Sequence, residues 1–117
     1  MTKLQRIAAR GQSIWFDDLR RDLLTSGELQ RLVEEDSVTG VTTNPTILAR
    51  AISESSDYDA QLDALARAAA TVEEAYAALV TSDIRAACDV LRPVWEAVGG
   101  ADGFVSVEVS PAVAHDT

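Results

Sequence analysis

The sequence predicts an α/β protein built on a short parallel sheet with helices on both faces. Three runs rich in β-branched or aromatic residues, at 13–17, 37–43 and 103–111, are separated by stretches with helical periodicity. Strands that alternate with helices form right-handed crossovers, which make the sheet parallel. Each run also ends near polar residues, and the carboxyl ends of parallel strands meet at one edge of the sheet. The same pattern therefore predicts the fold class and a candidate site.

The first strand is predicted at 13–17, after an amphipathic helix at 4–9 that Gly11 ends. The run is continuously apolar, which is typical of a strand buried on both faces. It stops at two acids, Asp17 and Asp18, so an acid is expected at the carboxyl end of this strand.

One or two helical turns are expected at 19–24, before the second strand. Residues 25–28 (Thr-Ser-Gly-Glu) have the form of a capping box, in which the first and fourth side chains cap the start of a helix reciprocally. This pattern predicts a helix through Leu29, Leu32 and Val33.

The central strand leads into a polar turn that carries Thr42 and Asn44. Both residues would lie at the carboxyl end of the strand, where α/β proteins keep their binding and catalytic groups. Pro45 disfavours the helical conformation for the residue before it, so Asn44 is expected to be extended. The alternative is that Asn44 merely caps the helix that begins near Pro45.

Helices are predicted over most of the segment between the second and third strands. A short helix follows the central turn, a second covers 58–69, and a capping box at 71–74 opens a third, which runs to about Val80. Apolar residues at intervals of three and four then predict the longest helix, over 82–98, with a kink at Pro93.

The third strand is predicted at 103–111 and carries Glu108 between two valines. A carboxylate in a run otherwise suited to burial is costly unless it is paired, hydrogen-bonded or used in a reaction. We therefore expect Glu108 to belong to a functional site, the alternative being a solvated strand end.

The composition indicates one globular domain, with 47% hydrophobic and 25% charged residues. A formal net charge of −9 argues against nucleic acid as a partner, because phosphates attract basic surfaces. The chain has no run of about 18 apolar residues that could span a membrane, and its start lacks the features of a signal peptide. A cytoplasmic protein with no membrane partner is expected.

Side chains suited to metal binding or covalent catalysis are few. Cys88 lies on the apolar stripe of the long predicted helix and is expected to be a buried thiol. One cysteine and one histidine, His115, cannot form a metal site by themselves. Lys3, the only lysine, precedes the first strand, so chemistry that needs a lysine inside the fold has no candidate.

Three parallel strands make an incomplete protein. The sheet would have two unprotected edges, and nothing would cover the last strand. A complete (β/α)8 barrel needs about 250 residues. The 117-residue chain, which shows no internal repeat or domain boundary, is therefore expected to be a piece of a larger α/β fold.

Three motifs resemble, in order and spacing, the first three strands of transaldolase, and most of all the long bacterial transaldolases. The motifs are Ile14–Leu19 (IWFDDL), Gly40–Thr46 (GVTTNPT) and Val105–Val109 (VSVEV). The likeness extends over the helices between them, notably at 58–61 and 86–91. It implies that residues 1–117 are the amino-terminal part of a single (β/α)8 TIM barrel of the class I aldolase type.

The resemblance also implies an activity: transfer of a dihydroxyacetone unit from sedoheptulose 7-phosphate to glyceraldehyde 3-phosphate, giving erythrose 4-phosphate and fructose 6-phosphate, in the pentose phosphate pathway. A lysine on the fourth strand forms a Schiff base with the ketose, without metal or cofactor. By match to the motifs, Asp17 would be the acid/base, and Glu108 would move protons through water as the Schiff base forms and hydrolyses. Asn44 and Thr42 would hydrogen-bond hydroxyls of the three-carbon unit.

The Schiff-base lysine has no counterpart in this chain, which alone is expected to be inactive. The chain would then be a fragment that joins the remaining barrel strands or associates with itself. The alternative is a non-catalytic, stand-alone interaction or regulatory module derived from the barrel. Intact site residues, and sheet edges without obvious runs of protective lysines or prolines, favour the fragment.

Overall fold

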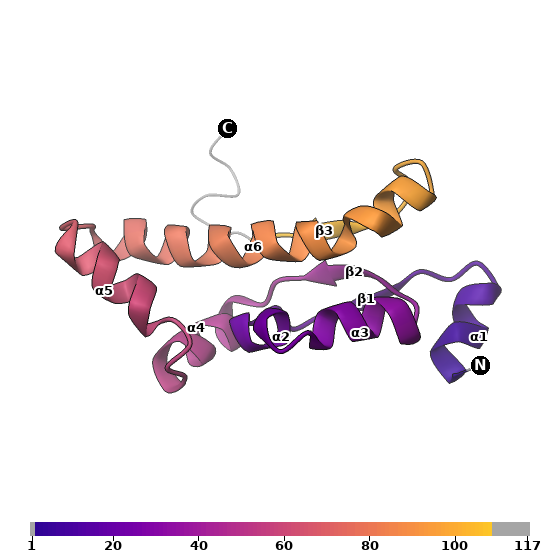
Figure 1. The fold of residues 1–117 in the computed structure, drawn as a ribbon, viewed down its shortest axis with the longest axis horizontal. Helices are drawn as coiled ribbons and strands as arrows, with labels where there is room; N and C mark the ends of the chain where they lie inside the picture. The colour runs from indigo at the N-terminus through magenta and orange to yellow at the C-terminus, as the bar shows by residue number, and fades with distance from the viewer. Residues whose placement is uncertain (1, 109–117) are drawn as a thin grey trace.

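The computed structural model describes residues 2–108 and contains one three-stranded sheet with helices (Figure 1). The strands are parallel and lie in the order β1-β2-β3, which confirms the predicted fold class. In chain order the elements are α1 (Lys3–Ala9), β1 (Ile14–Phe16), α2 (Arg21–Thr25), α3 (Glu28–Glu35), β2 (Val38–Thr42), α4 (Pro45–Glu54), α5 (Asp59–Arg67), α6 (Val72–Ala97) and β3 (Phe104–Ser106).

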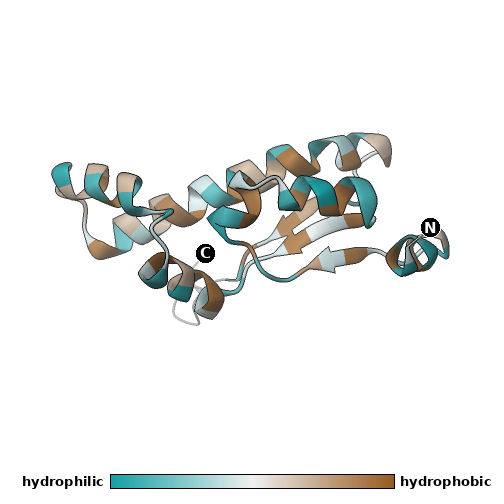
Figure 2. Cartoon of the chain, turned by 60° about the horizontal axis from the view of Figure 1, so that its bottom comes forward, coloured by the Kyte–Doolittle hydropathy of each residue, from teal (hydrophilic) through white to brown (hydrophobic). Residues whose placement is uncertain are grey.

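The helices that contact the sheet pack on one of its faces (Figure 2), so the expectation that both faces would be covered is wrong for the described residues. On the covered face Val41 lies in register between Phe16 and Val105. These side chains pack against a buried cluster from the β1–α2 loop, α2, α3 and α6: Leu19, Leu23, Leu29, Ala87 and Leu91. Helices on one face and side chains alone on the other is the arrangement of a barrel wall.

The open face of the sheet, as defined here, consists of Trp15, Gly40, Thr42, Phe104 and Ser106, which alternate with the core residues along the strands. Trp15 is 38% exposed and Phe104 is 45% exposed. Gly40 makes room for the indole, because a Cβ at this position would lie 2.2 Å from Cε2 of Trp15. The prediction that the first strand is buried on both faces is therefore wrong for the described residues, because residues 2–108 cover only one face of the sheet.

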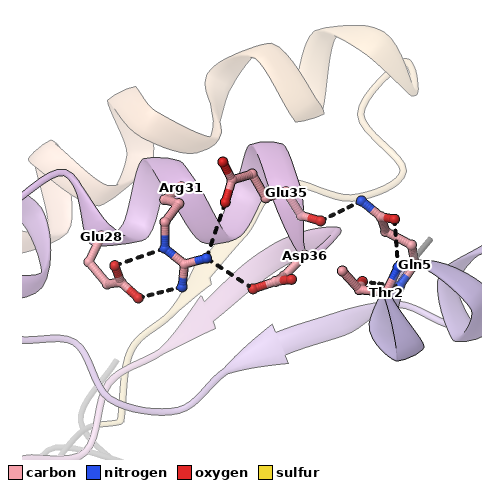
Figure 3. Close-up of polar contacts among 6 residues, drawn as sticks. All are labelled: Thr2, Gln5, Glu28, Arg31, Glu35 and Asp36. Carbon is pink, nitrogen blue, oxygen red and sulfur yellow. Dashed lines mark hydrogen bonds and ion pairs between the residues drawn. The ribbon is translucent and has the colours of Figure 1, made fainter.

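A hydrogen bond from the Gln5 side chain joins α1 to the end of α3 (Figure 3). Thr2 and Gln5 form a capping box at the start of α1, and the Gln5 side chain donates to the carbonyl oxygen of Glu35, the last residue of α3. Arg31, in the middle of α3, pairs with Glu28 at the start of the helix at 2.6 Å and with Glu35 at its end at 3.2 Å. Because Glu35 lies just before β2, α1 sits at the amino-terminal end of the strands.

One of the two predicted capping boxes is confirmed. Thr71 and Glu74 cap each other's backbone at the start of α6. The pattern at 25–28 does not form a capping box, because Thr25 is the last residue of α2 and Gly27 is the residue before α3. Gly27 has a φ of 80°, a conformation that glycine adopts without steric cost, so it turns the chain between the two helices.

α6 is a single helix of 26 residues, where the sequence predicted two. Ser82 and Asp83, which were expected to start the second helix, lie inside it. Ser82 Oγ donates to the carbonyl oxygen of Ala78, one turn earlier, at 2.9 Å, and Asp83 is buried. Despite the length of α6, no helix within residues 2–108 is long and apolar enough to cross a membrane.

Cys88 is exposed, so the expectation of a buried thiol is wrong. The buried face of α6 is a narrow stripe of Leu79, Asp83, Ala87 and Leu91, spaced four residues apart. Cys88 follows Ala87 and is turned by about 100° from it around the helix, away from the core.

Candidate active site

Polar residues follow each of the three strands at the same edge of the sheet. Asp17 comes directly after β1, Thr42 is the last residue of β2, and Glu108 lies beyond the end of β3. Because the strands are parallel and β2 lies between the other two, these positions share the carboxyl edge. Asn44 lies at the same edge, immediately before α4.

Asp17 and Thr42 contact each other directly. The Thr42 hydroxyl donates a hydrogen bond to Oδ1 of Asp17. Thr42 lies on the open face, and the contact brings the Asp17 carboxylate to the same side. The carboxylate is exposed, so it is accessible to a ligand on this face and can accept a proton from it.

Asn44 is extended, as Pro45 predicts, and it caps α4. Its Oδ1 accepts hydrogen bonds from the backbone N–H groups of Thr46, at 3.1 Å, and Ile47, at 3.3 Å. The capping role that the sequence left open is therefore present. It occupies only the oxygen of the amide, so the Nδ2 group can still donate to a ligand.

Glu108 is held by its backbone and not by its carboxylate. Its N–H donates to Oγ1 of Thr43 at 2.9 Å, and the N–H of Thr43 donates to the carbonyl oxygen of Ser106 at 2.9 Å. The Glu108 side chain is exposed, so the cost of burial that suggested a site there does not apply. β3 is also shorter than the predicted strand at 103–111, of which residues 109–111 lie outside the described part of the chain.

Thr43 is a residue whose role sequence reasoning missed. It is 3% exposed and joins the ends of β2 and β3. The available signal was the alternation of side chains in a strand, which directs Thr43 to the opposite side from Thr42 and hence toward the core.

Asp18 faces a different environment from Asp17. Its carboxylate pairs with Arg20 at 3.0 Å, and Arg20 also pairs with Asp22 at 3.0 Å. These three residues line one side of a cavity of about 430 Å³, and α4 and the residues before α5 line the rest. Asp17 is not among the lining residues, so this cavity lies beside the candidate site.

The carboxylate of Asp102 lies at the amino-terminal ends of β1 and β3, at the opposite edge of the sheet from the candidate site. It accepts hydrogen bonds from Ser13 Oγ at 2.7 Å, from Trp15 Nε1 at 3.2 Å and from the N–H of Gly103 at 3.0 Å. Burial alone raises the pKa of Asp102, but these hydrogen bonds, with that from Ser13 first, lower the pKa by more and hold it below its usual range. This contact links the amino-terminal ends of β1 and β3, at the opposite edge of the sheet from Asp17.

Within residues 2–108, no three His, Cys, Asp or Glu side chains are grouped as metal ligands would be. What the carboxyl edge does offer is an accessible carboxylate, a hydroxyl and an amide donor, which together can bind a polyhydroxylated ligand and exchange a proton with it.

Three parallel strands with helices on one face and polar groups at their carboxyl edge place this protein in the α/β class, in an arrangement consistent with part of a (β/α) barrel. Comparison with known families makes the class specific. Residues 14–117 match the sequence model of the Transaldolase/Fructose-6-phosphate aldolase family. The chain belongs to this family.

Individual relatives are similar over nearly the whole chain. The chain is 54% identical over 114 residues to a transaldolase of Mycobacterium ulcerans, 51% identical to one of Mycobacterium tuberculosis, and 49% identical to transaldolase 2 of Nostoc punctiforme. Each match covers 97% of this chain but only 30–31% of the relative. The chain therefore spans about a third of the length of these relatives.

Proposed function

We propose that residues 1–117 form the amino-terminal part of a single transaldolase barrel and supply the acid/base half of its active site. The reaction would transfer a dihydroxyacetone unit between sugar phosphates, from sedoheptulose 7-phosphate to glyceraldehyde 3-phosphate, in the pentose phosphate pathway of the cytoplasm. The observation that carries the proposal is the contact between Asp17 and Thr42 at the carboxyl edge, in a chain about half identical to transaldolases.

Asp17 would accept the proton of the substrate hydroxyl whose deprotonation drives carbon–carbon cleavage, and would return it in the reverse step. Thr42 would hold the carboxylate in place and, with the free amide donor of Asn44, bind hydroxyls of the three-carbon unit. Glu108 would transfer protons through water while the covalent intermediate forms and hydrolyses.

The nucleophile must come from outside the described residues. A lysine that forms a Schiff base supplies the electron sink for such a cleavage. Lys3 does not meet this need, because it lies in α1, at the amino-terminal end of the strands, whereas Asp17 lies at the carboxyl edge. The chain alone would therefore be inactive and would depend on the remaining barrel strands.

The proposal is tested by borohydride reduction in the presence of fructose 6-phosphate. The chain alone should keep its mass, whereas the chain continued by the remaining strands of a transaldolase barrel should gain a stable adduct on a lysine of the added part. The continued chain should also transfer the three-carbon unit to erythrose 4-phosphate.

Two results would contradict the proposal. An adduct on the isolated chain would show that its chemistry does not need a lysine from a later strand. A continued chain that folds but neither forms an adduct nor transfers the unit would favour the alternative, a non-catalytic module derived from the barrel.

A further inference from the structure

A buried polar network joins α2, α6 and the residue before α5. Asp83, in the middle of α6, is 2% exposed, and Tyr58 is 0% exposed. The Tyr58 hydroxyl donates to Oδ2 of Asp83 at 2.6 Å, and Nε of Arg21 donates to Oδ1 at 2.9 Å. The network was not predicted, because its members lie far apart in the sequence and each resembles an ordinary surface or core residue.

Arg21 is held by this network through its backbone and its side chain together. Its backbone N–H donates to the Tyr58 hydroxyl at 2.9 Å, and its guanidinium lies 4.3 Å from the centre of the Tyr58 ring. Burial, followed by the hydrogen bond to Asp83, raises the pKa of Tyr58 well above its usual value, so the hydroxyl stays protonated and remains a donor.

The network lies where it can control the loop that follows β1. Arg21 is the first residue of α2, and only three residues separate it from Asp17. Leu19, between them, is 1% exposed and packs in the core. The loop is therefore fixed at Leu19 by packing and at Arg21 by hydrogen bonds, whereas the side chain of Asp17 contacts the hydroxyl of Thr42.

A merely structural role explains this arrangement poorly. A buried ion pair loses hydration on folding, and well-packed apolar residues in its place often stabilise a protein equally well or better. What a fully hydrogen-bonded network of this kind can add is directional contacts that rigidify the backbone it holds. Catalytic groups need this precision, because their support must keep them close to the productive position.

We propose that Tyr58 and Asp83 are positioning residues for Asp17. By holding the backbone of Arg21, they fix the loop after β1 so that the Asp17 carboxylate stays beside Thr42 and faces the open side of the sheet. This inference rests on the proposed function, in which Asp17 is the acid/base.

The decisive variant is Tyr58→Phe in the chain continued to a complete barrel. It removes one hydroxyl, keeps the ring in the core, and leaves the pair between Arg21 and Asp83 in place. We expect kcat to fall by about tenfold or more, because a small misplacement of a catalytic group has a large effect on rate. KM for the sugar phosphate should change by less than about twofold, since no substrate contact is lost.

Leu62→Ala is the matched control. Leu62 packs against the same buried cluster as Tyr58. Its backbone N–H donates to the carbonyl oxygen of Tyr58 at 2.9 Å, a bond that alanine keeps, and its side chain makes no hydrogen bond to Arg21, Asp83 or the Tyr58 hydroxyl. The variant should lower the melting temperature at least as much as Tyr58→Phe and leave kcat unchanged. A change in kcat that only Tyr58→Phe shows therefore separates positioning from general stability.

Hydrogen exchange in the chain continued to a complete barrel gives a second measure that needs no activity. Amides of residues 18–20 should exchange faster in Tyr58→Phe than in Leu62→Ala at equal overall stability; the amide of Arg21 is left out because Tyr58→Phe removes its acceptor directly. Equal exchange and equal kcat in the two variants would overturn the inference. If Asp17→Ala instead kept full turnover, the proposed function itself would fail, and this result is distinct from a silent Tyr58→Phe.

Discussion

Asp17 and Asp18 are adjacent in sequence but differ in what they contact. Asp17 accepts from Thr42 at the carboxyl edge, whereas Asp18 pairs with Arg20 beside a separate cavity. In the continued barrel we expect Asp17→Ala to lower kcat by at least about a hundredfold, the lower range for losing a positioned acid/base group. Asp18→Ala should change kcat only a few-fold and lower stability by at most about 1 kcal/mol, because its ion pair is partly exposed.

Steady-state kinetics of both variants, with thermal melts as the control for folding, check this difference. A damaging Asp18→Ala with a silent Asp17→Ala would show that the site uses the other acid. It would also place the functional groups in the cavity beside α4 and not on the open face.

Asp102 is predicted to make the stability of the fold sensitive to acid. The pKa of its carboxyl is lowered in the folded state, so its stabilising effect is complete above the unfolded value, about 3.9, and is lost as the pH falls through the folded value. At neutral pH, Asp102→Asn should lower the free energy of unfolding by about 1 kcal/mol, because solvent screens this partly exposed carboxylate.

Urea unfolding at a series of pH values measures this effect. The difference in stability between the chain and Asp102→Asn should be constant above about pH 5 and should shrink below the unfolded pKa of an aspartate, about 3.9. A difference that stays the same down to pH 2 would show that the charge of Asp102 contributes nothing.

At the scale of elements, the sequence correctly predicted those helix and strand ends that depend on contacts between residues close in sequence. The capping box of Thr71 and Glu74 and the strand that ends at Thr42 depend on residues close in sequence, and both are present. The break expected near Asp83 is absent because Asp83 is satisfied by Arg21, 62 residues earlier. No local pattern contains that partner, so a polar residue inside a helix resembled a helix start.

In the candidate site, too, some features could be predicted from local sequence and others depend on contacts between distant residues. The positions of Asp17 and Thr42 at one edge follow from strand order, which alternating strands and helices predict. The exposure of Glu108 could not be predicted, because burial depends on where β3 ends and on which helices cover it. The bond between Thr43 and the Glu108 backbone also required the register of β2 against β3.

The contact of Gly40 with Trp15 predicts how the sheet responds to added volume. In Gly40→Ala the new methyl would lie 2.2 Å from the indole, so the ring must move, and we expect its hydrogen bond to Asp102 to weaken. Overpacking of this kind costs about 1–3 kcal/mol. Denaturant unfolding should show this loss, and the indole N–H signal of Trp15 should shift in nuclear magnetic resonance spectra.

A double-mutant cycle separates the clash from other effects of the substitution. Trp15→Ala removes the ring, so Gly40→Ala should cost much less in that background. If Gly40→Ala costs the same with and without the indole, the close packing of these two residues does not determine the effect.

At the scale of the whole molecule, helices cover only one face of the sheet within the described residues. The core of Leu19, Leu29, Val41 and Leu91 lies between the sheet and its helices. The open face carries the aromatic rings of Trp15 and Phe104, and the outer edges of β1 and β3 have no strand partner among residues 2–108. Apolar surface and unpaired strand edges both favour association with another chain.

We therefore expect the 117-residue chain, studied alone, to associate with itself or to be marginally stable. Sedimentation should show species larger than 12.5 kDa, and a dye that binds apolar surface should fluoresce in its presence. Trp15→Ser with Phe104→Ser should reduce both effects, whereas Val72→Ser, a change to an exposed residue at the start of α6, should not. A compact monomer that binds no dye and unfolds in one sharp thermal transition would show that the open face needs no partner, and would favour the stand-alone module over the barrel fragment.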